Sequence, residues 1–117
     1  MTIKLYGIKS CDTVRKARKW LETAGIDYNF VDLRQEPVSQ QTLTGWLEQI
    51  GHDVLINRRS TTWKGLSDSE REQASGARAA ALLAEYPTLI KRPVLEHGDR
   101  TLVGFDSARY QTEFNAQ

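Results

Sequence analysis

The fold is decided by residues 3–33, which read IKLYGIKSCDTVRKARKWLETAGIDYNFVDL. The first residues alternate in polarity and end in a glycine, as a short strand does. Apolar side chains then recur every three or four positions, which predicts a helix capped by Ser10 and stopped at Gly25. A second strand is expected at residues 28–33. Strand, helix and strand at this spacing predict a βαβ unit with parallel strands and a right-handed crossover.

The middle of the chain has the sequence pattern of a helical block. Ser39 can cap a helix that ends at Gly51, and residues 57–64 are polar and predict a loop. Residues 67–70 have the spacing of a capping box and predict another short helix. Alanine and leucine dominate residues 77–85, which favours a helix there.

The last quarter predicts a hairpin followed by a helix. Two short apolar runs between residues 93 and 103 flank the turn signal Gly98-Asp99, and Ser107 can cap a final helix. The order β-α-β, helical block, β-β-α indicates an α/β protein with a mixed four-stranded sheet in a thioredoxin-like arrangement. We therefore expect residues 1–117 to form one domain with a helical insertion at about 39–86.

Composition excludes several function classes. The chain of 117 residues is 39% hydrophobic, carries a net charge of +1 and has one cysteine. Near-neutral charge offers no general attraction for nucleic acid or anionic membranes. The longest apolar run, residues 79–84, is far below the roughly 20 that a membrane span needs. Lys4 and Lys9 interrupt any apolar signal segment at the start, so we expect a cytoplasmic protein. A monomer is the expectation, although the sequence leaves the oligomeric state open.

Cys11 stands between the first strand and the first helix. Helix N-termini carry unpaired N–H groups and a partial positive charge, which stabilise a thiolate and lower the pKa of the thiol. Residues 1–34 also hold seven basic and four acidic side chains. These features indicate a reactive nucleophile. The alternative is a buried, inert cysteine, which is the common fate of a free thiol.

A lone cysteine limits the redox chemistry. Position 14 is valine, so the C-x-x-C pair of a dithiol protein is missing, and no internal disulfide or zinc cluster can form. A redox cycle at Cys11 therefore needs a second thiol from glutathione or a partner protein. The basic run at residues 15–19 could suggest nucleic acid, but its helical spacing is typical of a solvated helix face.

Four segments of the chain carry a family resemblance: YGIKSCDTVRKA at residues 6–17, LINRRSTTW at 55–63, IKRPVL at 90–95 and LVGFD at 102–106. In sequence and order they resemble the arsenate reductase (ArsC-like) family, most closely its YffB-type branch and more distantly the Spx-type regulators of RNA polymerase. The resemblance implies a thioredoxin-like fold with a helical insertion.

The resemblance also implies roles for individual residues. Cys11 matches the family nucleophile, and Arg92 matches an anion-binding arginine. Arg58 and Arg59 are further candidates to stabilise the thiolate or an anion. Pro93 matches a cis-proline whose neighbourhood contacts substrate or glutathione through backbone groups, although a proline is also simply tolerated at a strand start. The resemblance implies glutathione as co-substrate, glutaredoxin as a further partner, and no bound cofactor or metal.

This sequence departs from the family pattern at two anion-binding positions. Asn57 stands where arsenate reductases have a second arginine, and residues 103–105, Val-Gly-Phe, lack the third. A tetrahedral oxyanion needs several convergent donors. The sequence therefore predicts a glutathione-dependent thiol oxidoreductase. The alternatives are a true arsenate reductase and a non-catalytic regulator of the Spx type, whose usual C-x-x-C switch is absent here.

Overall fold

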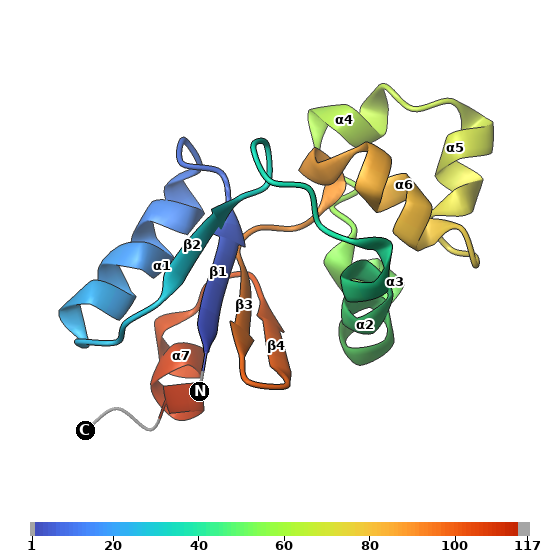
Figure 1. The fold of residues 1–117 in the computed structure, drawn as a ribbon. Coiled ribbons are helices and arrows are strands. Elements are labelled where there is room, and N and C mark those ends of the chain that lie inside the picture. The colour runs from blue at the N-terminus through green and yellow to red at the C-terminus, as the bar shows by residue number, and fades with distance from the viewer. Residues whose placement is uncertain (1, 115–117) are drawn as a thin grey trace. The chain divides into compact units, whose positions relative to one another are not determined.

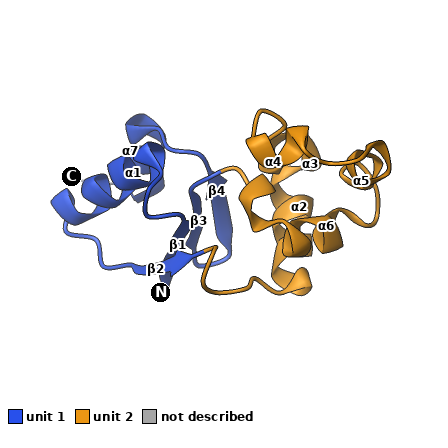
Figure 2. Ribbon diagram, turned by 90° about the horizontal axis from the view of Figure 1, so that it is seen from above, with its two compact units in different colours: residues 1–32, 92–117 blue, residues 33–91 orange. Residues whose placement is uncertain are grey.

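The computed structural model describes residues 2–114, and it divides them into two compact units. Unit 1 combines residues 2–32 with 92–114, and unit 2 is the intervening segment 33–91 (Figure 2). The sequence-based division into one domain with an insertion at 39–86 stays a prediction.

Unit 1 is a sheet of mixed direction with two helices (Figure 1). Its elements, in chain order, are β1 (Ile3–Gly7), α1 (Asp12–Thr23), β2 (Asn29–Asp32), β3 (Val94–His97), β4 (Arg100–Val103) and α7 (Ser107–Phe114). The strand order is β2-β1-β3-β4, with β1 parallel to β2 and antiparallel to β3, and β3 antiparallel to β4. This is the predicted α/β, thioredoxin-like arrangement.

Both helices of unit 1 begin one residue away from the predicted cap. Cys11, not Ser10, is the N-cap of α1, because its backbone is extended (φ −81°, ψ 124°) and its carbonyl accepts the first helical hydrogen bond. Likewise Asp106, not Ser107, caps α7, since its carboxylate accepts from two N–H groups of the first turn at 2.8 and 3.4 Å. Gly25 ends α1 at φ 73°, as predicted.

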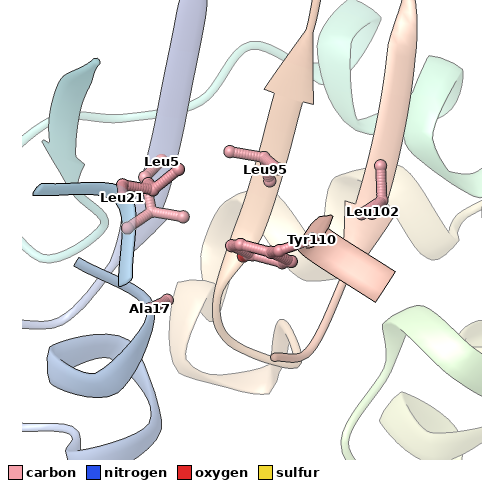
Figure 3. Close-up of a cluster of buried hydrophobic side chains, with 6 residues drawn as sticks. All are labelled: Leu5, Ala17, Leu21, Leu95, Leu102 and Tyr110. Atoms are coloured by element: carbon pink, nitrogen blue, oxygen red, sulfur yellow. The ribbon is translucent and has the colours of Figure 1, made fainter. Parts of the chain in front are cut away.

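The core of unit 1 lies between the sheet and both helices (Figure 3). Its buried members come from β1, β3, β4, α1 and α7 and are Leu5, Leu95, Leu102, Ala17, Leu21 and Tyr110. Because α1 and α7 contribute to one cluster with these strand residues, they pack on the same face of the sheet. The first turn of α1 is thereby held against the end of β1.

Gly7 allows that close approach. A Cβ at this position would stand 2.7 Å from Cγ2 and 2.8 Å from Cγ1 of Val14, which is fully buried. We predict that Gly7→Ala lowers the free energy of unfolding by about 2 kcal/mol, because a stiff, buried valine has no room to move. Chemical denaturation measures the loss. The control is Gly45→Ala in unit 2, where an added Cβ meets nothing within 4 Å. An equal loss of unfolding free energy in both variants would contradict the steric explanation.

Tyr110 carries an unusual polar group in this core. The side chain is 1% exposed, and within residues 2–114 its hydroxyl has no hydrogen-bond partner. Burial raises the pKa of Tyr110 far above its ordinary value, with the Arg109 charge opposing the effect. We predict that Tyr110→Phe stabilises the fold by about 1 kcal/mol, because a buried, unbonded hydroxyl is removed. Tyr28→Phe is the contrast and should not stabilise the fold, since the Tyr28 hydroxyl bonds to Arg18 and Glu22. Thermal melts in which Tyr28→Phe is the more stable variant would contradict the prediction.

Unit 2 is helical. Its elements are α2 (Gln40–Ile50), α3 (His52–Leu55), α4 (Thr61–Lys64), α5 (Asp68–Gln73), α6 (Ala79–Glu85) and the 3₁₀ turn η1 (Pro87–Leu89). Ser39 caps α2, and the predicted capping box of Ser67 and Glu70 opens α5. The loop predicted at 57–64 is only partly correct, because the Ser60 hydroxyl accepts from the Trp63 N–H and starts the single turn α4.

No helix in the described part of the chain is both long and apolar enough to cross a bilayer.

Candidate active site

Strand pairing brings Cys11 and Arg92 to one edge of the sheet. Tyr6, near the end of β1, pairs with Val94 at the start of antiparallel β3. The segment that follows β1 and the segment that precedes β3 therefore meet at this edge. The segment after β1 carries Cys11, and the segment before β3 carries Arg92. Two residues that are far apart in sequence become neighbours in this way.

The Cys11 loop is a tight turn that leads directly into α1. The Cys11 N–H donates to the carbonyl of Ile8 at 3.0 Å, and the Cys11 carbonyl accepts from the N–H of Arg15 at 3.0 Å. The cysteine is therefore held at the N-cap, where the free N–H groups of the first turn lie. The residue is partly exposed.

The pKa of the Cys11 thiol lies below its ordinary value. Partial burial raises this pKa, but the Val14 N–H, the Arg92 guanidinium with its charge and the Thr13 N–H lower it and outweigh burial. The Cys11 side chain makes no capping hydrogen bond at the start of α1, so the two N–H groups act on the sulfur electrostatically. They still stabilise the thiolate, which is the nucleophilic form. The predicted electropositive surroundings of Cys11 thus come mainly from Arg92 and the helix start.

Pro93 follows Arg92 through a cis peptide bond, as the sequence analysis expects. The Pro93 carbonyl accepts from the N–H of Gly104 at 2.9 Å, which ties it to the end of β4. The predicted backbone contact of this region with substrate or glutathione stays a prediction.

Arg58 and Arg59 lie in unit 2, and their predicted approach to Cys11 stays a prediction. Arg58 pairs with Asp53 at 2.7 Å, and its guanidinium carbon lies 5.4 Å from the centre of the Trp63 ring. Both arginines line a surface hollow of about 560 Å³ together with Asp53, Val54, Ile56, Asn57 and Lys91. Three cations against one carboxylate make this hollow electropositive.

One side chain beside the cysteine loop and one buried carboxylate on β2 escaped the sequence analysis. Arg15 was assigned to a solvated helix face, yet its guanidinium also turns back onto the cysteine loop. The spacing of Asp12 and Arg15, three apart on one helix, signals their ion pair but not the bonds of Arg15 to the loop carbonyls. Asp32 is the second: it is 8% exposed and pairs with Gly7 in the parallel ladder. Among the described residues no group of three or more His, Cys, Asp and Glu side chains could hold a metal ion.

Comparison with known proteins identifies the family of this chain. The profile of the ArsC family matches residues 6–113. The chain belongs to the ArsC family. A protein of uncharacterised function from Haemophilus influenzae is 43% identical over 112 residues, which cover 96% of this chain and 98% of that protein. A solved structure named YffB is 40% identical, covers 95% of this chain and 97% of its own, and superposes with a TM-score of 0.90.

The ArsC family also has relatives that are named as regulators. The global transcriptional regulator Spx 2 of Oceanobacillus iheyensis is 32% identical over 107 residues, which are 90% of this chain and 78% of that protein. The sequence resemblance to the ArsC family, with the YffB-type branch nearer and Spx more distant, is therefore confirmed. Membership alone leaves two kinds of function to be weighed.

Proposed function

We propose that this protein is a thiol oxidoreductase that uses Cys11 as its nucleophile and glutathione as its co-substrate. The observation that carries the proposal is the hydrogen bond and positive charge that Arg92 supplies to a partly exposed cysteine at a helix start. Thiol reactivity depends on the thiolate fraction, and this environment raises it. ArsC membership supports the same class of chemistry.

The proposed cycle has two exchange steps. The Cys11 thiolate attacks the glutathione sulfur of an oxidised protein carrying a mixed disulfide; a Cys11–glutathione disulfide forms, and the protein thiolate leaves and takes a proton. A glutathione thiolate then attacks the glutathione sulfur of that disulfide, which releases oxidised glutathione and restores the Cys11 thiolate. Two electrons pass from glutathione to the substrate, and no second cysteine is needed. Glutaredoxin is a further candidate donor for the second step.

Arg92, in unit 1, acts on the Cys11 sulfur in this proposal. Arg92 stabilises the Cys11 thiolate both before attack and when it leaves. Within unit 2, Arg58 and Arg59 offer cations for an anionic group. The backbone beside Pro93 would align the disulfide. Such a cycle needs a glutathione-rich, reducing compartment, so we propose the cytoplasm.

Mass spectrometry tests the proposal. Incubation with oxidised glutathione is expected to add one glutathione to the wild-type protein, and reduced glutathione is expected to remove it. Cys11→Ser is expected to gain no mass. A wild-type protein that stays unmodified, or whose thiol titrates like free cysteine, would end the proposal.

Arsenate reduction is the second enzymatic candidate, because the chain belongs to the ArsC family and its sequence resembles the arsenate reductases. Residues 103–105 offer no arginine, and Arg109 is engaged with the Val103 carbonyl at 3.1 Å. Turnover of arsenate with glutathione and glutaredoxin, lost in Cys11→Ser, would establish this activity in place of thiol reduction.

A regulatory role is the remaining candidate and rests on the 32% identity to Spx 2. Recovery of RNA polymerase subunits by the wild-type protein and equally by Cys11→Ser would favour this role. The absence of such recovery, together with glutathione addition, favours the enzyme.

A further inference from the structure

The cysteine loop is fastened by a side chain from the second turn of its own helix. Arg15 donates from Nε to the Lys9 carbonyl at 3.3 Å and from Nη2 to the Ser10 carbonyl at 3.2 Å. It also donates from Nη1 to Oδ1 of Asp12 at 2.9 Å. One guanidinium thus holds acceptors from residues 9, 10 and 12, on both sides of Cys11.

We propose that Arg15 is a positioning residue for Cys11, which acts by clamping the cysteine loop in the geometry that directs the first N–H groups of α1 at the sulfur. This inference rests on the proposed thiol chemistry and adds a residue that acts through the loop.

Arg15 fixes the direction of two backbone dipoles in the cysteine loop. The carbonyls of Lys9 and Ser10 bond to Arg15, so their negative ends are held and neutralised by a cation. Carbonyls released from this contact could turn toward the sulfur, where they would oppose a thiolate. The Thr13 and Val14 N–H groups act on the sulfur only while the loop keeps its turn.

Arg15 also neutralises the charge of Asp12, which directly follows Cys11. A carboxylate in the first turn favours the helix but disfavours a thiolate beside it. Arg15 pairs with this carboxylate, so the local field at the sulfur is left to Arg92 and the helix start. The other charged group of the loop is Lys9, whose side chain is exposed.

The geometry of the clamp requires arginine. The three nitrogens of the planar guanidinium each donate to a different acceptor. A lysine ammonium group has one nitrogen and cannot reach all three acceptors from separate positions. The Arg15 side chain is 61% exposed, so its charge acts on Cys11 through a solvent-screened path and the clamp is expected to outweigh its direct field. The effect of substitution should therefore follow the shape of the side chain more than its charge.

The test is the rate of Cys11 alkylation by iodoacetamide from pH 5 to pH 10. Wild type is expected to show a lowered apparent pKa. Both Arg15→Gln and Arg15→Lys should shift the profile upward and react about fivefold more slowly at pH 7, because a looser loop leaves less thiolate. Lys16→Gln removes a neighbouring exposed charge from the same helix and should match wild type.

The outcomes separate the two proposals. A lowered wild-type pKa that Arg15→Gln retains would overturn the clamp and leave the proposed function standing. Full reactivity in Arg15→Lys with a loss in Arg15→Gln would overturn the clamp in favour of a charge effect. An ordinary pKa in wild type would remove the proposed function and this inference together. Thermal melts show that each variant is folded at the temperature used.

Discussion

Replacing Arg92 with glutamine is expected to raise the pKa of the Cys11 thiol and to slow its alkylation about tenfold at a pH below the wild-type pKa. Arg92 stabilises the thiolate in two ways, by a hydrogen bond and by its charge. Glutamine keeps a donor but loses the charge. Below its pKa the thiol is mostly protonated, and the thiolate fraction follows the pKa directly. Well above the pKa both proteins are fully ionised, and their rates should converge.

The control for Arg92→Gln is Lys19→Gln, which removes one exposed cation from α1. The pH dependence of Cys11 alkylation in Lys19→Gln is expected to match that of wild type, because an exposed charge is screened by solvent and salt. A measured pKa that is equal in Arg92→Gln and wild type would mean that Arg92 does not stabilise this thiolate. The proposed role of Arg92 would then be wrong, even if Cys11 proved reactive for another reason.

Replacing Glu113 with glutamine is expected to lower the free energy of unfolding at pH 7 by about 2 kcal/mol, because charge-assisted hydrogen bonds are lost in a buried place. The Glu113 side chain is 4% exposed. It accepts from Arg100 at 2.8 to 3.0 Å and contacts Nδ1 of His97 at 2.7 Å. These bonds tie the end of α7 to both strands of the β3–β4 hairpin.

The contribution of Glu113 should depend on pH in a defined direction. Burial raises the pKa of this carboxyl, but the hydrogen bonds and charges of Arg100 and His97 lower it below its ordinary value. The folded protein therefore releases this proton more readily than the unfolded chain. The stabilisation is complete above the ordinary glutamate pKa of about 4.3 and is lost as the pH falls through the lower, folded value.

Urea denaturation at pH 7 and at pH 3 measures this dependence. The difference in unfolding free energy between wild type and Glu113→Gln should narrow at the lower pH, because protonation of Glu113 removes the charge that glutamine lacks. Glu36→Gln, at an exposed position, is the matched control and should show little gap at either pH. If Glu113→Gln differs from wild type by the same free energy of unfolding at both pH values, the carboxylate charge is not what stabilises α7.

Local sequence signals predicted the elements of the fold well. Ser39, the Ser67 capping box and Gly25 act within a few residues of themselves, so their effects can be read directly from the chain. The turn at Gly98, with φ 64°, is of the same kind. The N-caps of α1 and α7 were each misplaced by one residue, since neighbouring polar residues compete for the cap and packing decides between them.

The candidate site was only half predictable. Position alone identified Cys11, because a strand, a short loop and a helix can be recognised from periodicity. Its pairing with Arg92 came from the family resemblance, and the physical link between them is the antiparallel pairing of β1 with β3. The loop contacts of Arg15 were missed because they depend on a rotamer, which a pattern of residue types does not specify.

The amino-acid sequence by itself determined the βαβ and ββα patterns, the lone cysteine and the need for an outside thiol, because these follow from neighbouring residues and from counting. Tertiary structure alone decided which cation reaches the sulfur, which side chain clamps the loop and which carboxylate is buried at α7. Those outcomes depend on strand register and side-chain packing, which join residues from distant parts of the chain. In this protein the nucleophile is a local feature, and the environment that activates it is largely a tertiary one.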